Sequence, residues 1–88
     1  MTAPAPPPPP ALPPLYALRA FECVARTGSV TLAGQTLHVT QSTISKHLKT
    51  LETHFGCKLL LRTGPRLALT PQGDMLAVQL RQGFHRIE

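Results

Sequence analysis

The chain has 88 residues, a length that favours one small domain with a single core. The formal net charge is +5, and the stretch from Lys46 to Arg66 contains five basic residues and one acid, Glu52. This local excess suggests a polyanionic partner, although an ordinary solvated basic surface explains it as well. No apolar run reaches the length of a membrane span, and no basic and then apolar leader opens the chain, so we expect a cytoplasmic protein with no membrane partner.

The first 14 residues contain eight of the ten prolines and no charged residue. This composition is typical of a disordered polyproline II tail, which adds nothing to a core. We therefore divide the chain into a Pro-rich tail (residues 1–14), a folded domain (residues 15–70) and the start of a linker or dimerisation helix (residues 71–88).

A first helix is predicted over residues 15–27, and Gly28 ends it because glycine commonly follows a last helical turn. Its expected core stripe, which includes one polar residue, consists of Leu15, Leu18, Phe21, Glu22 and Ala25.

A second, short helix follows, with the hydroxyl of Ser29 or Thr31 as its N-cap. Its expected core face consists of Val30, Ala33, Gly34 and Leu37. The small Ala33 and Gly34 would let another helix approach closely. His38 and Val39 then form a brief turn, from which Val39 is free to point inward.

The third helix has the clearest pattern. It is predicted from Gln41 to Phe55, with Thr40 as N-cap and Gly56 at its end. Apolar residues at i, i+4, i+7 and i+11 form a narrow core stripe of Ile44, Leu48, Leu51 and Phe55. The opposite side, which carries no acid, consists of Ser42, Ser45, Lys46, Lys49 and Thr53, with Gln41 beside it at the amino end.

After Gly56, short apolar runs over residues 58–62 and 66–69 surround a Gly-Pro turn, a pattern that indicates a β-hairpin. Thr70 and Pro71 then resemble an N-cap and a first helical residue. The apolar stripe of this last helix, which we interpret as a dimerisation face for a partner helix, consists of Leu76, Leu80, Phe84 and Ile87.

Two short helices, a tight turn and a basic hairpin indicate a mostly α fold, a winged helix-turn-helix followed by a linker helix. The major groove of DNA admits an α-helix, and side chains at its amino end read base edges through hydrogen bonds. The residues that we expect to contact DNA are Gln41, Ser42, Thr43, Ser45, Lys46 and Lys49 on the third helix and Arg62 and Arg66 on the hairpin.

Simpler roles stay open for these residues. Gln41 could be an ordinary first-turn residue, and Ser42 and Thr43 could be exposed without a partner. Ser45 could bond back to a carbonyl of its own helix. Arg62 could pair with a helix-terminal carbonyl, while Lys49 and Lys58 could add only to the general positive field.

Taken together, these residues resemble the amino-terminal DNA-binding domain of LysR-type transcriptional regulators. The matching stretches are residues 18–21 (LRAF), 24–26 (VAR), 28–29 (GS), 33–41 (AGQTLHVTQ), 45, 51–52 (LE), 55–56 (FG), 58–62 (KLLLR) and 69–73 (LTPQG). The two ends of the match look most like the subgroup of glycine-cleavage and β-lactamase regulators.

The resemblance implies a bacterial transcription factor that binds partly palindromic double-stranded DNA as a dimer or tetramer and is associated with the nucleoid. It places DNA contacts at Gln41, Ser42, Ser45 and Lys46, assigns the wing arginine to Arg62, and gives the helix from Pro71 onward the role of pairing two subunits, here as a homodimer.

Three departures from the family pattern bear on the reading. Gly34 stands where a second alanine is usual, which would loosen the second helix, and Leu60 replaces a usual phenylalanine, which would leave the wing less fully packed. Family members also continue into a domain that binds a small effector. We therefore expect no small-molecule effector for this chain, as a truncated regulator, a gene fragment or a stand-alone DNA-binding half.

The sequence offers no paired carboxylates, activated nucleophile or phosphate loop, so we expect no enzyme. Cys23 and Cys57 have no zinc-ligand spacing, and we expect neither metal nor cofactor; small buried thiols are favoured, with a disulfide left open. Two other functions stay open: a protein-interaction module that titrates a full-length paralogue through the last helix, and a Pro-rich ligand over residues 4–14.

Overall fold

The computed structural model of the chain describes residues 13–63 and 66–87. Residues 1–12, which form most of the Pro-rich tail, lie outside this description, as do the hairpin tip at residues 64–65 and the last residue. Only the backbone is described for Thr63, Arg66 and residues 84–87.

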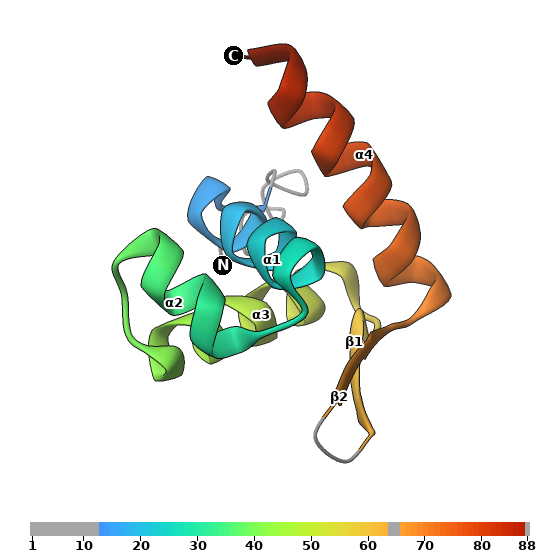
Figure 1. Cartoon of the computed structure of the whole chain (residues 1–88). Coiled ribbons are helices and arrows are strands. Elements are labelled where there is room, and N and C mark those ends of the chain that lie inside the picture. The colour runs from blue at the N-terminus through green and yellow to red at the C-terminus, as the bar shows by residue number, and fades with distance from the viewer. Residues whose placement is uncertain (1–12, 64–65, 88) are drawn as a thin grey trace, which may run out of the picture.

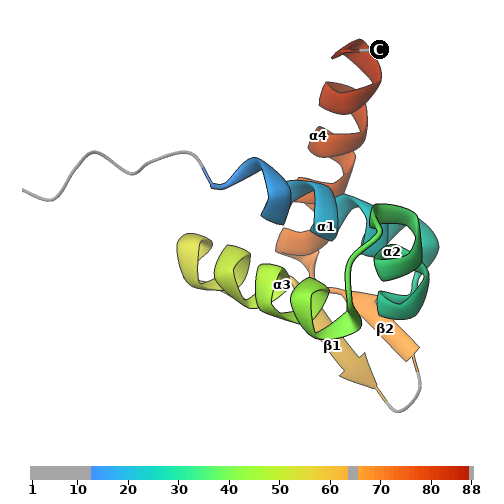
Figure 2. The same ribbon diagram turned by 90° about the vertical axis from the view of Figure 1, so that its left-hand side faces the viewer.

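The described residues form a cluster of three helices, a two-stranded antiparallel hairpin and a fourth helix. The elements in chain order are α1 (Leu15–Thr27), α2 (Val30–Leu37), α3 (Gln41–Phe55), β1 (Leu60–Thr63), β2 (Arg66–Leu69) and α4 (Pro71–Ile87). Figures 1 and 2 agree that the hairpin projects from one side of the α1–α3 cluster, whereas the far half of α4 leaves it in the opposite direction. This is the mostly α winged helix-turn-helix arrangement that the sequence predicts.

Helix boundaries follow the local stop and start signals. Gly28 and Gly56 end α1 and α3 in the left-handed region, at φ 72° and 68°, where glycine has no Cβ clash. The hydroxyl oxygens of Ser29 and Thr40 accept the N–H groups of the third residue along, in both cases at 3.1 Å. These caps are confirmed at the predicted positions, with Ser29 and not Thr31 opening α2.

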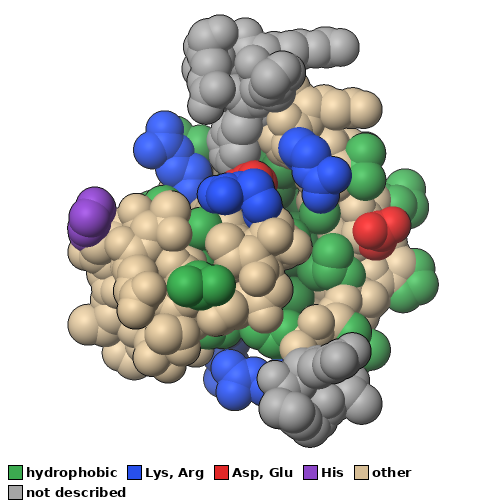
Figure 3. Space-filling model, in the orientation of Figure 1, with side chains coloured by type: hydrophobic (Ala, Val, Ile, Leu, Met, Phe, Trp, Pro, Cys, Tyr) green, Lys and Arg blue, Asp and Glu red, His purple; other side chains and the backbone are tan. Residues whose placement is uncertain are grey.

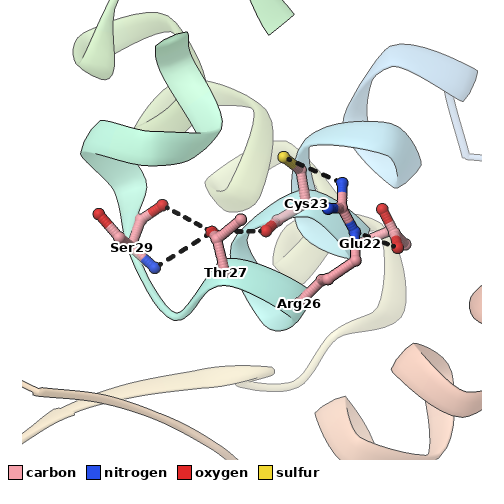
Figure 4. Close-up of polar contacts among 5 residues, drawn as sticks. All are labelled: Glu22, Cys23, Arg26, Thr27 and Ser29. Carbon is pink, nitrogen blue, oxygen red and sulfur yellow. Dashed lines mark hydrogen bonds and ion pairs between the residues drawn. The ribbon is translucent and has the colours of Figure 1, made fainter. Parts of the chain in front are cut away.

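The junction between α1 and α2 is closed by side-chain hydrogen bonds (Figure 4). The hydroxyl oxygen of Thr27 lies 2.7 Å from the carbonyl oxygen of Cys23 and accepts the N–H of Ser29 at 3.3 Å. One residue earlier along the helix, the Arg26 guanidinium donates to the Glu22 carboxylate at 3.1 Å. The polar residue in the predicted stripe thus forms an ion pair at the edge of the helix.

The buried face of α1 differs from the predicted stripe. Leu15 is 56% exposed, and Leu18 and Ala25 are half-buried. The buried side chains of the helix are Ala17, Ala20, Phe21, Cys23 and Val24. The predicted stripe was wrong for Leu15 because the prediction favoured large apolar residues. The small Ala17 and Ala20 are buried instead, and they let α2, α3 and α4 pack closely against this helix.

The core stripe of α3 is confirmed for Ile44, Leu48 and Leu51, which are at most 7% exposed. It is wrong for Phe55, which is 43% exposed. Phe55 is the last helical residue, and its ring borders an open apolar cavity of about 270 Å³ together with Met75 and Leu76 of α4. The periodicity continued to the end of the helix, but the packing did not.

The turn between α2 and α3 corrects one expectation, because Val39 is exposed. The close approach that Gly34 permits is made by the turn and by the first residue of α3, Gln41. A Cβ on Gly34 would lie 2.8 Å from the Val39 carbonyl oxygen. His38 adopts the left-handed region at φ 59°, which the chain needs in order to reverse direction between the two helices.

The start of α4 is held against the residues that precede β1. Thr70 donates its hydroxyl to the Lys58 carbonyl at 2.7 Å and its N–H to the Leu59 carbonyl at 3.1 Å, and it accepts the N–H of Gly73 at 3.0 Å. Ala77 is buried, so the first half of α4 belongs to the same core as the other helices.

Candidate nucleic-acid interface

The amino-terminal half of α3 presents polar side chains to solvent. On α3, the exposed residues among those expected to contact DNA are Gln41, Ser42, Ser45, Lys46 and Lys49. Thr43 is half-buried, and its hydroxyl oxygen accepts a hydrogen bond from the Thr40 hydroxyl at 2.8 Å. The structure therefore brings five of the six helix residues onto an open surface and leaves the sixth partly engaged within the cap.

This surface is held rigidly from behind. Ile44 and Leu51 are fully buried on the opposite side of α3, so the helix cannot rotate without exposing its core stripe. At the edge, the His47 ring lies 4.5 Å from the ring of Tyr16 on α1, centroid to centroid. The polar face consequently has one orientation relative to the rest of the domain.

The hairpin register decides which wing residues face α3. Leu60 pairs with Leu69 and Arg62 with Leu67, so these four residues share one face of the hairpin. Three of them are half-buried, and Arg62 is exposed near the tip. Arg66 pairs with Thr63 in the register, and its side chain lies outside the described residues.

A groove of about 450 Å³ separates α3 from the wing. Its polar and charged lining comes from Ser45, Lys49, Glu52, Lys58 and Arg62, and its apolar lining from Leu48, Leu60, Leu61 and Leu67. The exposed face of α3 therefore continues into a groove that carries three cationic side chains and one carboxylate.

That carboxylate belongs to Glu52, which in the sequence stands out only as the single acid between Lys46 and Arg66. Its Oε2 accepts the N–H groups of Leu59 at 2.7 Å and Leu60 at 3.2 Å, and its Oε1 lies 3.9 Å from the Lys58 ammonium. The available signal was an acid between Lys49 and Lys58 that comes eight residues before a strand. Nothing in the sequence indicated which groups would form hydrogen bonds to the Glu52 carboxylate.

The apolar stripe of α4 is partly used inside the domain. Leu76 and Leu80 are half-buried against the core, whereas Met75 and Val78 are 66% and 44% exposed. The side chains of Phe84 and Ile87 lie outside the described residues. The open apolar surface on the described part of α4, formed by Met75 and Val78, therefore lies beside the predicted stripe and not on it.

Charged side chains elsewhere form no second site among the described residues. Lys and Arg side chains are spread over the face seen in Figure 3, with apolar side chains between them. Among the described residues, no group of three His, Cys, Asp or Glu side chains could hold a metal ion, and Cys23 and Cys57 are free thiols. Within the same residues, no helix has both the length and the hydrophobicity that crossing a membrane requires.

Comparison with known proteins supports this arrangement. The family model of bacterial regulatory helix-turn-helix proteins of the lysR family matches residues 15–74. The chain is 45% identical over 74 residues to the HTH-type transcriptional activator AmpR of Citrobacter freundii, a match that covers 84% of this chain and 25% of that protein. It is 40% identical over 76 residues to the glycine cleavage system transcriptional activator of Escherichia coli K12, covering 86% and 25%.

Solved structures share the fold. A complex of the BenM DBD with catB site 1 DNA superimposes with a TM-score of 0.79 at 27% identity, over 84% of this chain and 82% of that chain. A CbnR DBD–DNA complex gives 0.74 at 29% identity, over 82% and 83%. The chain spans about a quarter of the length of the curated relatives that it matches. From its sequence and its fold alike, the chain belongs to the LysR family of bacterial helix-turn-helix regulators.

Proposed function

We propose that this chain binds double-stranded DNA in a sequence-dependent manner and thereby takes part in the control of transcription. The observation that carries the proposal is the open, acid-free amino-terminal face of α3, which continues into the cationic groove beside Arg62. Such a face matches the groove floor of DNA, which presents hydrogen-bond donors and acceptors between two rows of phosphates.

On this proposal the amino end of α3 enters the major groove. Gln41 is suited to read adenine through its amide, and Lys46 to donate to guanine. Ser42 and Ser45 donate to bases or phosphates. Thr43 contributes less directly, because it is half-buried and its hydroxyl oxygen already accepts from the Thr40 hydroxyl.

The wing adds contacts that do not depend on sequence. Arg62 and Lys49, on opposite walls of the groove, are placed to meet one phosphate row, and we assign Arg66 to the same task. The DNA complexes of BenM and CbnR, whose folds this chain shares, support the proposal. The work of the chain is then binding without a chemical step, in the cytoplasm beside the chromosome.

A comparison of two variants tests the assignment. Gln41→Ala is expected to cost about 1–3 kcal/mol on a duplex selected from a random library by the wild-type chain, and much less on random duplexes. Arg62→Ala should weaken binding to both. Gln35→Ala, which removes an exposed amide from α2, is the matched control and should change neither. Equal losses on both duplexes for Gln41→Ala would contradict base reading.

We also propose that α4 pairs two copies of the chain. Exposed Met75 and Val78 and the extension of α4 beyond the cluster favour it. The proposed interface residues remain Leu76, Leu80, Phe84 and Ile87, joined by Met75 and Val78. Val78→Glu should shift the chain toward the monomer in sedimentation equilibrium, whereas Leu32→Glu, at a similarly exposed site on α2, should not. A wild-type monomer at millimolar concentration would argue against pairing.

The same exposed surface of α4 is what a protein-interaction module would use. Salt dependence separates that second function from DNA binding, since phosphate contacts weaken steeply with salt and apolar helix pairing does not.

A further inference from the structure

A two-stranded hairpin of four-residue strands is only marginally stable by itself, so its position depends on what holds it to the domain. The segment that leads into it, Lys58–Leu60, is the wing root. Leu59 is 2% exposed and anchors the root in the core. Burial of one side chain fixes a depth, but it leaves the angle of the hairpin relative to α3 open.

Polar bonds hold the wing root from two sides. On one side, Thr70 donates its hydroxyl to the Lys58 carbonyl and its N–H to the Leu59 carbonyl. On the other, a single carboxylate oxygen of Glu52 accepts both the Leu59 and Leu60 N–H groups, with the shorter bond at 2.7 Å. Bonds from backbone N–H to a carboxylate are short and roughly twice as strong as neutral ones. Because Glu52 belongs to α3, this clamp joins the wing directly to the helix with the polar face.

The charge of Glu52 is otherwise out of place. It lines the same groove as Lys49 and Arg62, where an anion opposes the approach of phosphate. Its ion pair with Lys58 is long, at 3.9 Å, and the Lys58 side chain is 77% exposed, so that pair stabilises little. The hydrogen bonds from the Leu59 and Leu60 N–H groups are therefore the contacts that stabilise a carboxylate at this position.

We infer that Glu52 is a positioning residue for DNA binding: it sets the distance between α3 and the wing, so that Arg62 reaches a phosphate only while α3 sits in the groove of the same duplex. This inference rests on the proposed function. It also makes a directional claim. Removal of a groove anion should strengthen DNA binding if charge alone matters, whereas loss of positioning should weaken it.

The test is a double-mutant cycle on the whole chain, with binding to a random-sequence duplex measured by fluorescence anisotropy over a range of salt concentrations. In the wild type, Arg62→Ala should lower the slope of log K against log salt by about one. Glu52→Ala should give nearly the same fall, and adding Arg62→Ala to it should give no further fall. The amide oxygen of Glu52→Gln can still accept the two N–H groups. In that variant, adding Arg62→Ala should again lower the slope by about one.

A matched control is available on α1. Glu22 has a side chain 17% exposed, against 18% for Glu52, and it pairs with Arg26 without touching the wing. Glu22→Ala should therefore leave the full effect of Arg62→Ala in place. Thermal unfolding of every variant identifies any loss of folded protein, and only the folded range of temperature is used for binding.

The outcomes are distinct. If Arg62→Ala lowers the slope equally with and without Glu52, or if Glu52→Ala raises the slope and the affinity, Glu52 does not position the wing. If Arg62→Ala changes nothing in the wild type, the inference fails although DNA binding stands. If the wild type shows no salt-dependent binding, the proposed function itself fails. Amide exchange at Leu59 and Leu60 then still tests the clamp, because unchanged rates in Glu52→Ala would show that the carboxylate does not hold the root.

Discussion

Replacement of Gly73 by alanine probes the junction between the wing root and α4. Gly73 is the third residue of α4, and a Cβ there would overlap the Leu59 carbonyl oxygen and lie 3.0 Å from the carbonyl carbon. Real Cβ atoms essentially never approach another heavy atom closer than 3.0 Å. The obstacle is backbone and not the end of a flexible side chain, so α4 or the wing root must move.

The size of the effect follows from what that movement breaks. Overpacking of this kind costs about 1–3 kcal/mol. The bonds from Thr70 to the carbonyls of Lys58 and Leu59 span the same junction, and their loss adds about 1 kcal/mol each. Alanine returns about 1 kcal/mol through its higher helix propensity. We expect a net loss of about 2–4 kcal/mol, which is large for so small a domain.

Thermal unfolding followed by circular dichroism measures the loss. At about 4–8 °C per kcal/mol for a domain of this size, Gly73→Ala should lower Tm by about 8–32 °C. Gly83→Ala is the matched control, since it lies on the same helix with nothing within 4 Å of its Cβ position. It should raise Tm by a few degrees through helix propensity alone. A Gly73→Ala variant that melts at or above the wild-type temperature would refute the steric argument.

Three further substitutions test the local structure by the same measurement. His38→Gly should stabilise the domain by up to about 1 kcal/mol, because glycine occupies φ 59° without a Cβ clash; a loss would indicate that the imidazole makes a stabilising contact. Thr40→Ala should cost about 1 kcal/mol by removing the α3 cap, and Thr40→Ser should cost little, so equal losses would argue against capping. Leu51→Ala should cost about 2–5 kcal/mol as a cavity in the core, and a cost below 1 kcal/mol would mean that the site collapses.

The boundaries of the elements were predictable because they depend on short-range effects. Gly28 and Gly56 end α1 and α3 because each adopts the left-handed conformation that follows a last helical turn. The hydroxyl oxygens of Ser29 and Thr40 cap α2 and α3 by accepting N–H groups three residues further along. The exposed polar face of α3 was predictable for a related reason. A helix with one apolar stripe must present its other side to solvent, whatever covers the stripe.

Prediction from the sequence failed for residues whose burial depends on which other element packs against them. Phe55 has the spacing of a core residue, but it is 43% exposed because α4 leaves an open cavity beside it. Leu15 is exposed, whereas the smaller Ala17 and Ala20 are buried in its place. The hairpin register also needed the structure, because a shift by one residue would turn Arg62 to the other face of the wing.

The sequence by itself therefore determined the helices, their caps, the hairpin and the residues of the polar face, since each depends on neighbours within about one helical turn or one strand pair. Only the tertiary structure decided how the wing is aimed. Glu52 meets N–H groups seven and eight residues away, and Thr70 meets a carbonyl twelve residues away. Those distances along the chain carry no periodic signal, because such contacts exist only after the helices have packed.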